Sequence, residues 1–345
     1  MVTTYPPKRC GIGAYAEQSV AQLRAQGHVV DLVSPDLQGN VDFAWNLLGG
    51  SNLLRLFRLL PYYDRVVLQY HWAFFYRNPF QRERRWETLQ TTLCFVLLFL
   101  RCRRLEVVAH EIPYIAGKQG WLYKWQWKLA PRIVFHTTRE REYFEKHYRM
   151  RLNPARIAFR GHDDVYQKFA DHTQSSARRQ LKLASQGLLF LCIGFIQRHK
   201  GFHRAIQAFA EAALPQAELF IVGSLRVMNA DNVKYLTELR QLAAEHSNVH
   251  LIESFVSNED FDTWIAAADC VVLPYSEIWS SAVLGRAQLL GRPAIVSTVG
   301  GLPEQAGKHD LVFGNHEELV RAFRALAHRS PDGAKRDSKP APCAP

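Results

Sequence analysis

The chain alternates short apolar runs with longer amphipathic stretches. The apolar runs are four to six residues long and almost uniformly nonpolar, which is typical of parallel strands that are buried on both faces. The amphipathic stretches between them predict helices. The alternation therefore predicts an α/β fold with parallel sheets. Strands are predicted at residues 28–33, 65–69, 106–109, 132–135 and 156–159 in the first half, and at 188–193, 218–222, 249–252, 270–273 and 294–297 in the second.

The length of 345 residues is enough for two domains of ordinary size. We predict a first doubly wound domain over residues 1–165, a polar linker over 166–186 and a second domain over 187–329. Residues 330–345 are rich in Pro, Ala and charge, so a disordered tail is predicted there. Only residues 2–5 precede the first proline pair, so the first strand is expected to be short or to lack its beginning.

The charge balance and the cysteines narrow the class of protein. Lys and Arg total 43 against 32 Asp and Glu, a net charge of +11, which permits nucleic acid, phosphorylated ligands or an acidic membrane as partners. The six cysteines have no paired spacing, so neither a zinc site nor a disulfide framework is indicated and a cytoplasmic location is expected. The longest apolar run, residues 93–100, is less than half of what a membrane span needs.

Three glycine-containing or charged loops follow predicted strands. Gly11 and Gly13 precede an amphipathic stretch, where glycines allow close approach of a ligand and a helix N-terminus offers free N–H groups. A simple tight turn explains this pair equally well. A third glycine is lacking, so the pair does not match a dinucleotide fingerprint.

A basic loop follows the strand predicted at 188–193. It begins at Gly194 and carries Arg198 and Lys200 directly before a helix. This is the end of a strand at which ligands bind in open α/β sheets, and Arg and Lys there suit a diphosphate. The alternative is a solvated basic loop without a ligand.

An acidic loop follows the strand predicted at 270–273. Glu277 would accept hydrogen bonds from hydroxyl groups of a ligand. The backbone amides of Ser280, Ser281 and Ala282 would lie at the N-terminus of a helix, where they can bind a phosphate. The alternative reading of Glu277 is a helix cap.

Taken in order, five stretches resemble the family 4 glycosyltransferases of the GT-B fold. They are PPKRCGIGAY, IGFIQRHKGF, ELFIVG, NVHLIESFVSNEDFDTWIAAADCVVLPYSE and VLGRAQLLGRPAIVSTVGGLPE. The resemblance implies two Rossmann-like doubly wound domains that face each other across a cleft. It also implies a nucleotide-sugar donor held mostly by the second domain, an acceptor held by the first, and retention of anomeric configuration without a metal or other cofactor.

The resemblance assigns roles to single residues. Lys200 and Arg198 would contact the donor diphosphate, Glu277 the donor sugar, and His110 would line the site near the reacting centre. These four are the predicted catalytic residues, although a lone histidine is more often structural. The predicted donor-binding residues are Gly11, Gly13, Gly194, Phe255, Val256, Ser280, Ser281 and Ala282.

Two positions depart from the family pattern. Gly285 stands where the family has a second Glu, usually assigned to the ribose, and Phe195 stands where an Arg usually follows the glycine of the phosphate loop. Arg198 is a candidate to provide the positive charge that this Arg usually supplies. A catalytically silent GT-B protein that acts as a scaffold is therefore the alternative to an enzyme.

The basic excess is concentrated in the first half. Residues 77–104 carry seven Arg and two Glu, and residues 139–160 carry seven Lys or Arg and three Glu. The acceptor is expected to be a glycan, a lipid-linked molecule or a small molecule, with peripheral contact to an anionic membrane as an option. The run at 93–100 is predicted as a buried core helix rather than an interfacial one. Nucleic acid is not expected, because no known binding module accompanies the charge.

Overall fold

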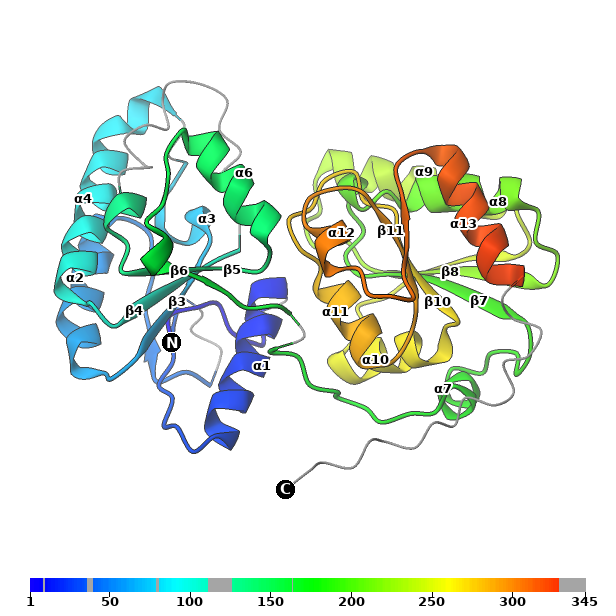
Figure 1. Cartoon of the computed structure of the whole chain (residues 1–345), viewed down its shortest axis with the longest axis horizontal. Coiled ribbons are helices and arrows are strands. Elements are labelled where there is room, and N and C mark those ends of the chain that lie inside the picture. The colour runs from blue at the N-terminus through cyan, green and yellow to red at the C-terminus, as the bar shows by residue number, and fades with distance from the viewer. Residues whose placement is uncertain (9, 36–39, 79–80, 111–125, 163, 329–345) are drawn as a thin grey trace. The chain divides into compact units, whose positions relative to one another are not determined.

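The computed structural model describes all residues except 9, 36–39, 79–80, 111–125, 163 and 329–345. Its described part forms two compact units (Figure 1). The first unit consists of residues 1–168, 278–289 and 299–305, and the second of residues 169–277, 290–298 and 306–345. The predicted tail, residues 330–345, lies outside the described residues. No helix in the described ranges is long and apolar enough to cross a membrane.

The sheet of the first unit is parallel. Its four main strands are ordered β3-β4-β5-β6, and β1 pairs with β2 beside them. Val2 forms parallel bridges to both Val33 and Leu68, so the residues before the first glycine pair lie between β1 and β3. This is the centre of a doubly wound sheet. The strands are β1 Val33–Ser34, β2 Phe43–Ala44, β3 Val66–Tyr70, β4 Leu105–Ala109, β5 Arg132–Phe135 and β6 Ile157–Phe159.

Helices cover this sheet and bury an aromatic core. Tyr70 of β3 stacks on Phe75 at 5.6 Å between ring centroids and meets Trp127 edge-on at 4.7 Å. Phe95 and Phe99 reach the same cluster and are fully buried. The helices of the unit are α1 Gly11–Ala25, α2 Gly50–Leu59, α3 Trp72–Phe75, α4 Arg85–Arg101, α6 Thr138–Tyr148, α11 Ala282–Leu289 and α12 Leu302–Gln305, with short 3-10 turns η1 Leu60–Tyr62, η2 Arg82–Arg84 and η4 Pro154–Arg156.

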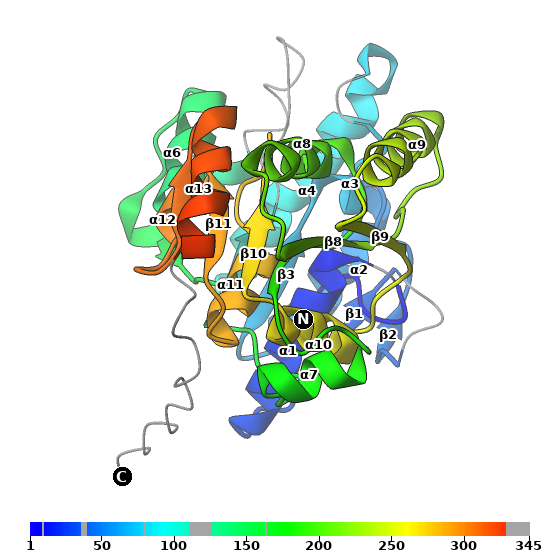
Figure 2. The same cartoon turned by 90° about the vertical axis from the view of Figure 1, so that its right-hand side faces the viewer.

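The sheet of the second unit is also parallel, with the order β12-β11-β10-β7-β8-β9. Figure 2 shows helices α8 and α9 on one face of this sheet and α7 and α10 on the other. The strands are β7 Leu188–Ile193, β8 Ala217–Gly223, β9 Val249–Glu253, β10 Cys270–Leu273, β11 Ala294–Ser297 and β12 Leu311–Phe313. The helices are α7 Gln174–Gln180, α8 Phe202–Ala212, α9 Ala230–Ala244, α10 Asn258–Ala267 and α13 His316–His328, with the 3-10 turn η5 Arg198–Lys200.

Nine of the ten predicted strands are present within one residue or two of the expected bounds, and the α/β prediction is confirmed. The prediction at 28–33 is wrong for most of that run, because only Val33 continues into β1. Val29 is 94% exposed, and the Leu32 amide donates to the Asp42 carboxylate at 2.7 Å instead of joining a strand ladder. The short strands β2 and β12 were not predicted.

Segments 278–289 and 299–305 pack with the first unit, although they fall inside the range 187–329 predicted for the second domain. Their contacts give the physical reason. The Glu304 carboxylate accepts hydrogen bonds from the amides of Thr138 and Arg139 at 2.7 and 3.0 Å, at the start of α6. Trp279 packs on Tyr143 of the same helix with 4.3 Å between ring centroids.

Candidate functional site

The order in which the chain adds strands to the sheet of the second unit reverses between β7 and β10. From β7 the chain adds β8 and β9 on one side, and then returns to place β10 on the other side of β7. The carboxyl ends of these two central strands are the topological switch point, where open α/β sheets bind their ligands. The basic loop and the acidic loop predicted from the sequence follow these two strands.

The loops at the switch point are tightly packed against each other. Gly201 has a φ of +64°, and a Cβ atom there would lie 2.1 Å from the carbonyl oxygen of Pro274. A Cβ on Gly223, at the end of β8, would lie 1.9 Å from the carbonyl oxygen of Gly194. The Ser276 amide donates to the His199 carbonyl oxygen at 2.9 Å. The loops that follow β7 and β10 are therefore fixed relative to each other.

Lys200 is positioned by this packing. Its ammonium group lies 4.0 Å from the centre of the Tyr275 ring, a cation–π contact. Burial lowers the pKa of Lys200 to about 8. A lysine in this state is still largely protonated at neutral pH, and its charge is poorly compensated by water. The switch point thus holds one partly desolvated cation, which is suited to an anionic group of a ligand.

Arg198 is engaged differently. Its guanidinium forms an ion pair with Glu238 of α9 and lies 4.7 Å from the centre of the Tyr235 ring. The side chain of Arg198 is 55% exposed. The second charge expected in the phosphate loop is therefore present but is paired with a carboxylate. Sequence reasoning did not identify Glu238, because α9 is about forty residues away along the chain.

The other predicted residues of the second unit lie at different distances from the switch point. Gly194 directly follows β7, and Glu277 lies four residues after the end of β10 and is exposed. Phe255 and Val256 follow β9, which is the edge strand two places from β7. Tyr275, missed from the sequence, lies two residues before Glu277, and an aromatic ring next to a predicted binding carboxylate is the signal that could have found it.

In the first unit, Gly11 and Gly13 lie in the first turn of α1 rather than in a loop. Neither has a positive φ. A Cβ on Gly13 would be 3.5 Å from the Thr4 carbonyl oxygen, an ordinary contact distance. The backbone conformation therefore does not demand glycine at either position.

His110 belongs to a cluster of three histidines at the carboxyl edge of the same sheet. His110 follows β4, His136 follows β5 and His162 comes soon after β6. The rings of His136 and His162 stack with 4.3 Å between centroids, and Tyr15 of α1 meets all three rings edge-on at 5.0 to 5.7 Å. The sequence signal for His136 and His162 was their position after predicted strands, the same signal that marked His110.

Hydrogen bonds fix the orientation of two of these rings. His136 Nδ1 lies 2.9 Å from the Arg160 carbonyl oxygen, which only accepts, so this nitrogen carries a proton. His136 Nε2 lies 3.3 Å from His110 Nδ1, within hydrogen-bonding distance. His110 Nε2 lies against Oε1 of Gln69, which only accepts, so this nitrogen of His110 donates. Both ring nitrogens of His110 are thus engaged within the unit.

Burial keeps His110 and His162 uncharged. It lowers the pKa of His110 well below the ordinary value of 6.5, and the neighbouring His136 and His71 lower this pKa further. The pKa of His162 is lowered in the same way by burial and then by His136 and His110. A fixed, neutral His110 is suited to orient other groups and is poorly suited to exchange a proton with a substrate.

The small residues predicted to bind phosphate also lie in the first unit. The Ser281 amide donates to the side chain of Gln305 at 2.8 Å, and its hydroxyl accepts from the Leu284 amide at 3.3 Å. Ser280 Oγ lies 3.1 Å from His162 Nε2. Ala282 is the first residue of α11. Of this group, Ser281 already has partners for both its amide and its hydroxyl.

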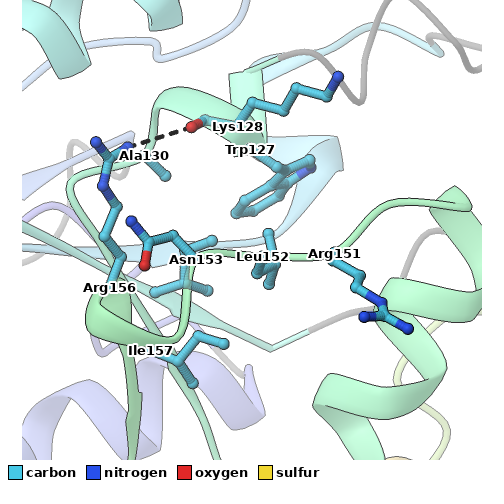
Figure 3. A pocket seen from close by; sticks show the side chains of 9 residues that line it. Trp127, Lys128, Ala130, Arg151, Leu152, Asn153, Arg156 and Ile157 are labelled. Carbon is cyan, nitrogen blue, oxygen red and sulfur yellow. Dashed lines mark hydrogen bonds between the residues drawn. The ribbon is translucent and has the colours of Figure 1, made fainter.

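A cavity of about 160 Å³ lies at the amino ends of β5 and β6, on the sheet edge opposite to the histidines. Its floor is apolar and includes Trp127 and Leu152. Figure 3 shows the side chains of Lys128 and Arg151 extending away from these two residues. The charged groups therefore do not converge, and none of the predicted site residues lines this cavity.

Residues 173–339 match the family model described as glycosyl transferases group 1. A curated relative, the D-inositol 3-phosphate glycosyltransferase of Corynebacterium aurimucosum, is 28% identical over a match that covers 59% of this chain and 59% of that protein. The chain thus spans about three fifths of the length of this relative.

Solved structures show the same fold. A sucrose-phosphate synthase from Thermosynechococcus elongatus has a TM-score of 0.68 at 16% identity, over 95% of this chain and 88% of that one. WaaG, a glycosyltransferase involved in lipopolysaccharide biosynthesis, has a TM-score of 0.63 at 19% identity, over 96% and 91%. HepE from Anabaena in complex with UDP has a TM-score of 0.63 at 15% identity, over 90% and 80%. The predicted GT-B fold class is confirmed.

Proposed function

We propose that the protein transfers a sugar from a nucleoside-diphosphate sugar to an acceptor, because residues 173–339 match the family model described as glycosyl transferases group 1. The observation that carries this proposal is the partly desolvated Lys200 at the switch point of the second unit, between the glycine-bounded loop after β7 and the loop of Glu277. UDP- and GDP-sugars are the proposed donors. HepE binds UDP in a fold of the same kind, which supports this donor class.

The proposed reaction needs little acid–base chemistry from the protein. Lys200 would stabilise the negative charge that develops on the departing diphosphate as its bond to the anomeric carbon breaks. Arg198 would add a second charge when the diphosphate displaces Glu238. Glu277 is exposed in the loop whose Ser276 amide contacts His199, and it would accept hydrogen bonds from hydroxyl groups of the donor sugar. We propose a retaining reaction in which the leaving phosphate takes the acceptor proton. We also propose that the reaction requires no metal, because Lys200 provides positive charge at the diphosphate.

His110 is proposed to position its neighbours within the first unit rather than to transfer protons, since Gln69 and His136 contact both of its ring nitrogens. The acceptor is proposed to be a glycan, a lipid-linked molecule or a small molecule in polysaccharide or glycoconjugate synthesis. The proposed location is the cytoplasm.

Release of free nucleoside diphosphate tests this function. The purified chain is incubated with UDP- and GDP-sugars, a crude glycan and lipid acceptor extract, and EDTA, and the nucleotide products are measured by mass spectrometry. We expect one donor class to be consumed. Binding of a nucleotide without turnover in any acceptor mixture would instead support the silent scaffold, for which Gly285 in place of a carboxylate is the sequence argument.

The ion pair of Arg198 leads to a separate prediction. Replacing Glu238 by glutamine removes the carboxylate that competes with a diphosphate for Arg198. Because an exposed ion pair contributes at most about 1 kcal/mol, we expect UDP or GDP to bind roughly two- to fivefold more tightly. Isothermal titration calorimetry measures the change. Glu245→Gln is the matched control. Glu245 is exposed, lies seven residues after Glu238, and its replacement should leave the affinity unchanged. Weaker binding in Glu238→Gln would show that the ion pair helps to shape the site.

A further inference from the structure

Helix α4 (Arg85–Arg101) is apolar on both faces over its second half, residues 93–100. Its inner face packs into the core of the first unit through Phe95, Leu98 and Phe99, which are fully buried. The prediction of a core helix is thus right for one face only. A helix that is apolar all round is normally covered on every side, so the opposite face requires an explanation.

The outer face of the second half of α4 forms an apolar row. Leu93, Leu97 and Leu100 follow each other at spacings of four and three residues and are 53%, 50% and 45% exposed. Trp86, near the start of the helix, is 82% exposed and is separated from Leu93 by the exposed polar side chain of Gln90. Single exposed leucines are common on soluble proteins, but three in a row over two turns of one helix face mark a candidate interaction surface.

Helix α2 (Gly50–Leu59) lies beside α4 and widens this surface (Figure 1). A Cβ atom on Gly50 would lie 3.0 Å from Cys94 Sγ, which shows how closely the two helices approach. Leu54 of α2 is 46% exposed. We call Leu54, Trp86, Leu93, Leu97 and Leu100 the outer leucine row.

The surroundings of the outer leucine row are strongly basic. Residues 50–104 contain ten Arg and three Asp or Glu, a net charge of +7. Arg55 and Arg58 on α2, and Arg101 and Arg103 at the end of α4, are exposed. Two of the three acidic residues are already paired with arginines, Glu87 with Arg84 at 3.0 Å and Asp64 with Arg104 at 3.4 Å. The apolar row therefore lies in a field of uncompensated positive charge.

We propose that the outer leucine row binds the interface of an anionic lipid bilayer. Leucines would enter the boundary between headgroups and acyl chains, and the flanking arginines would contact the negatively charged headgroups. A second copy of this chain is a poorer occupant, because a symmetric contact through this face would bring like charges together. The length and charges of α4 fit a helix that lies in the interface, and no described helix fits a membrane span.

This proposal bears on the acceptor. If the protein is a glycosyltransferase, as proposed above, binding at a bilayer favours the lipid-linked class among its three candidate acceptors. This consequence rests on the proposed function, whereas the binding itself does not. A vesicle experiment without any sugar donor therefore tests the surface independently of turnover.

Co-sedimentation of the full-length chain with vesicles tests the proposal. We expect binding to vesicles of phosphatidylcholine with 30% phosphatidylglycerol, taken as roughly the charge of an anionic membrane, and weak binding to phosphatidylcholine alone. The triple variant Leu93→Gln, Leu97→Gln, Leu100→Gln should lose at least about tenfold in partitioning. Arg101→Gln with Arg103→Gln should lose a similar factor, because each arginine contributes on the order of 1 kcal/mol near such a surface.

The matched control is Val227→Gln with Met228→Gln, which removes exposed apolar side chains from the second unit and should leave vesicle binding unchanged. The leucines are about half exposed, and circular dichroism of the triple variant verifies that it is folded. Equal binding of the wild type and of the folded triple variant would overturn the proposal. Absence of binding to anionic vesicles would also overturn the proposal. If the chain were then a dimer in solution that the triple variant abolishes, the row would be an interface between copies of the chain.

Discussion

Replacing Lys200 by alanine is expected to weaken the binding of a nucleoside diphosphate by roughly 10- to 100-fold. A hydrogen bond to a charged group contributes about 1.5–3 kcal/mol, and each 1.4 kcal/mol is a factor of ten. Lys200 is partly buried above the Tyr275 ring, so water screens its charge poorly. The variant should remain folded, because removing a desolvated charge does not cost stability. Calorimetric titration with UDP and GDP measures the loss.

The pH dependence provides the control for this prediction. The pKa of Lys200 in the free protein is about 8, and the side chain is charged below that value. Affinity for the diphosphate should therefore be constant near pH 7 and decrease as the pH rises through 8. Lys200→Arg keeps its charge throughout this range and should show a flat profile up to pH 9. An identical decrease in wild type and Lys200→Arg would place the titrating group elsewhere.

The first unit is expected to lose stability steeply in mild acid. His110 and His162 are neutral in the folded state, with pKa values well below 6.5, and both become protonated in the unfolded chain as the pH falls below about 6.5. The unfolded state then binds more protons than the native state, so the free energy of unfolding falls as the pH falls. The slope is up to about 1.4 kcal/mol per pH unit for each histidine. Urea unfolding at pH 7, 6 and 5 measures this slope.

His162→Phe tests the assignment of this acid sensitivity. The substitution keeps an aromatic ring next to His136 and removes one of the two histidines of the cluster whose pKa is lowered. We expect its stability to depend on pH less steeply than that of the wild type over the same interval. His28→Phe changes an exposed histidine and should keep the wild-type slope. A wild-type slope in His162→Phe would contradict the view that the buried cluster carries the effect.

Most of the strand pattern could be predicted because buried parallel strands have a strong local signature. The run at 188–193 is apolar at every position and becomes β7 as expected. The run at 28–33 is apolar at four of its six positions, yet Val29 is almost fully exposed and the Leu32 amide donates to the Asp42 carboxylate. Local pattern cannot foresee a competing side chain ten residues away. Likewise, the residues of α4 at 93–100 are apolar on both sides of the helix, and only the packing shows that one side is exposed.

The candidate site could be predicted only in part for the same reason. The loops of Lys200 and Glu277 were identified because each follows a predicted strand, and the order of strands in the sheet places them together. The partner of Arg198 lies on another helix, and the contacts of His110 come from strands β3 and β5. These are contacts between segments far apart in the sequence, so no local motif indicates them.

A thermal-shift titration of the wild-type chain against UDP, GDP, ADP, TDP and CMP, each with and without EDTA, tests the central claim most directly. A ligand that binds only the native state raises the melting temperature by mass action. We predict a shift with UDP or GDP that is insensitive to EDTA and is lost in Lys200→Ala. A folded protein that shows no shift with any of these nucleotides would contradict a donor site at the switch point.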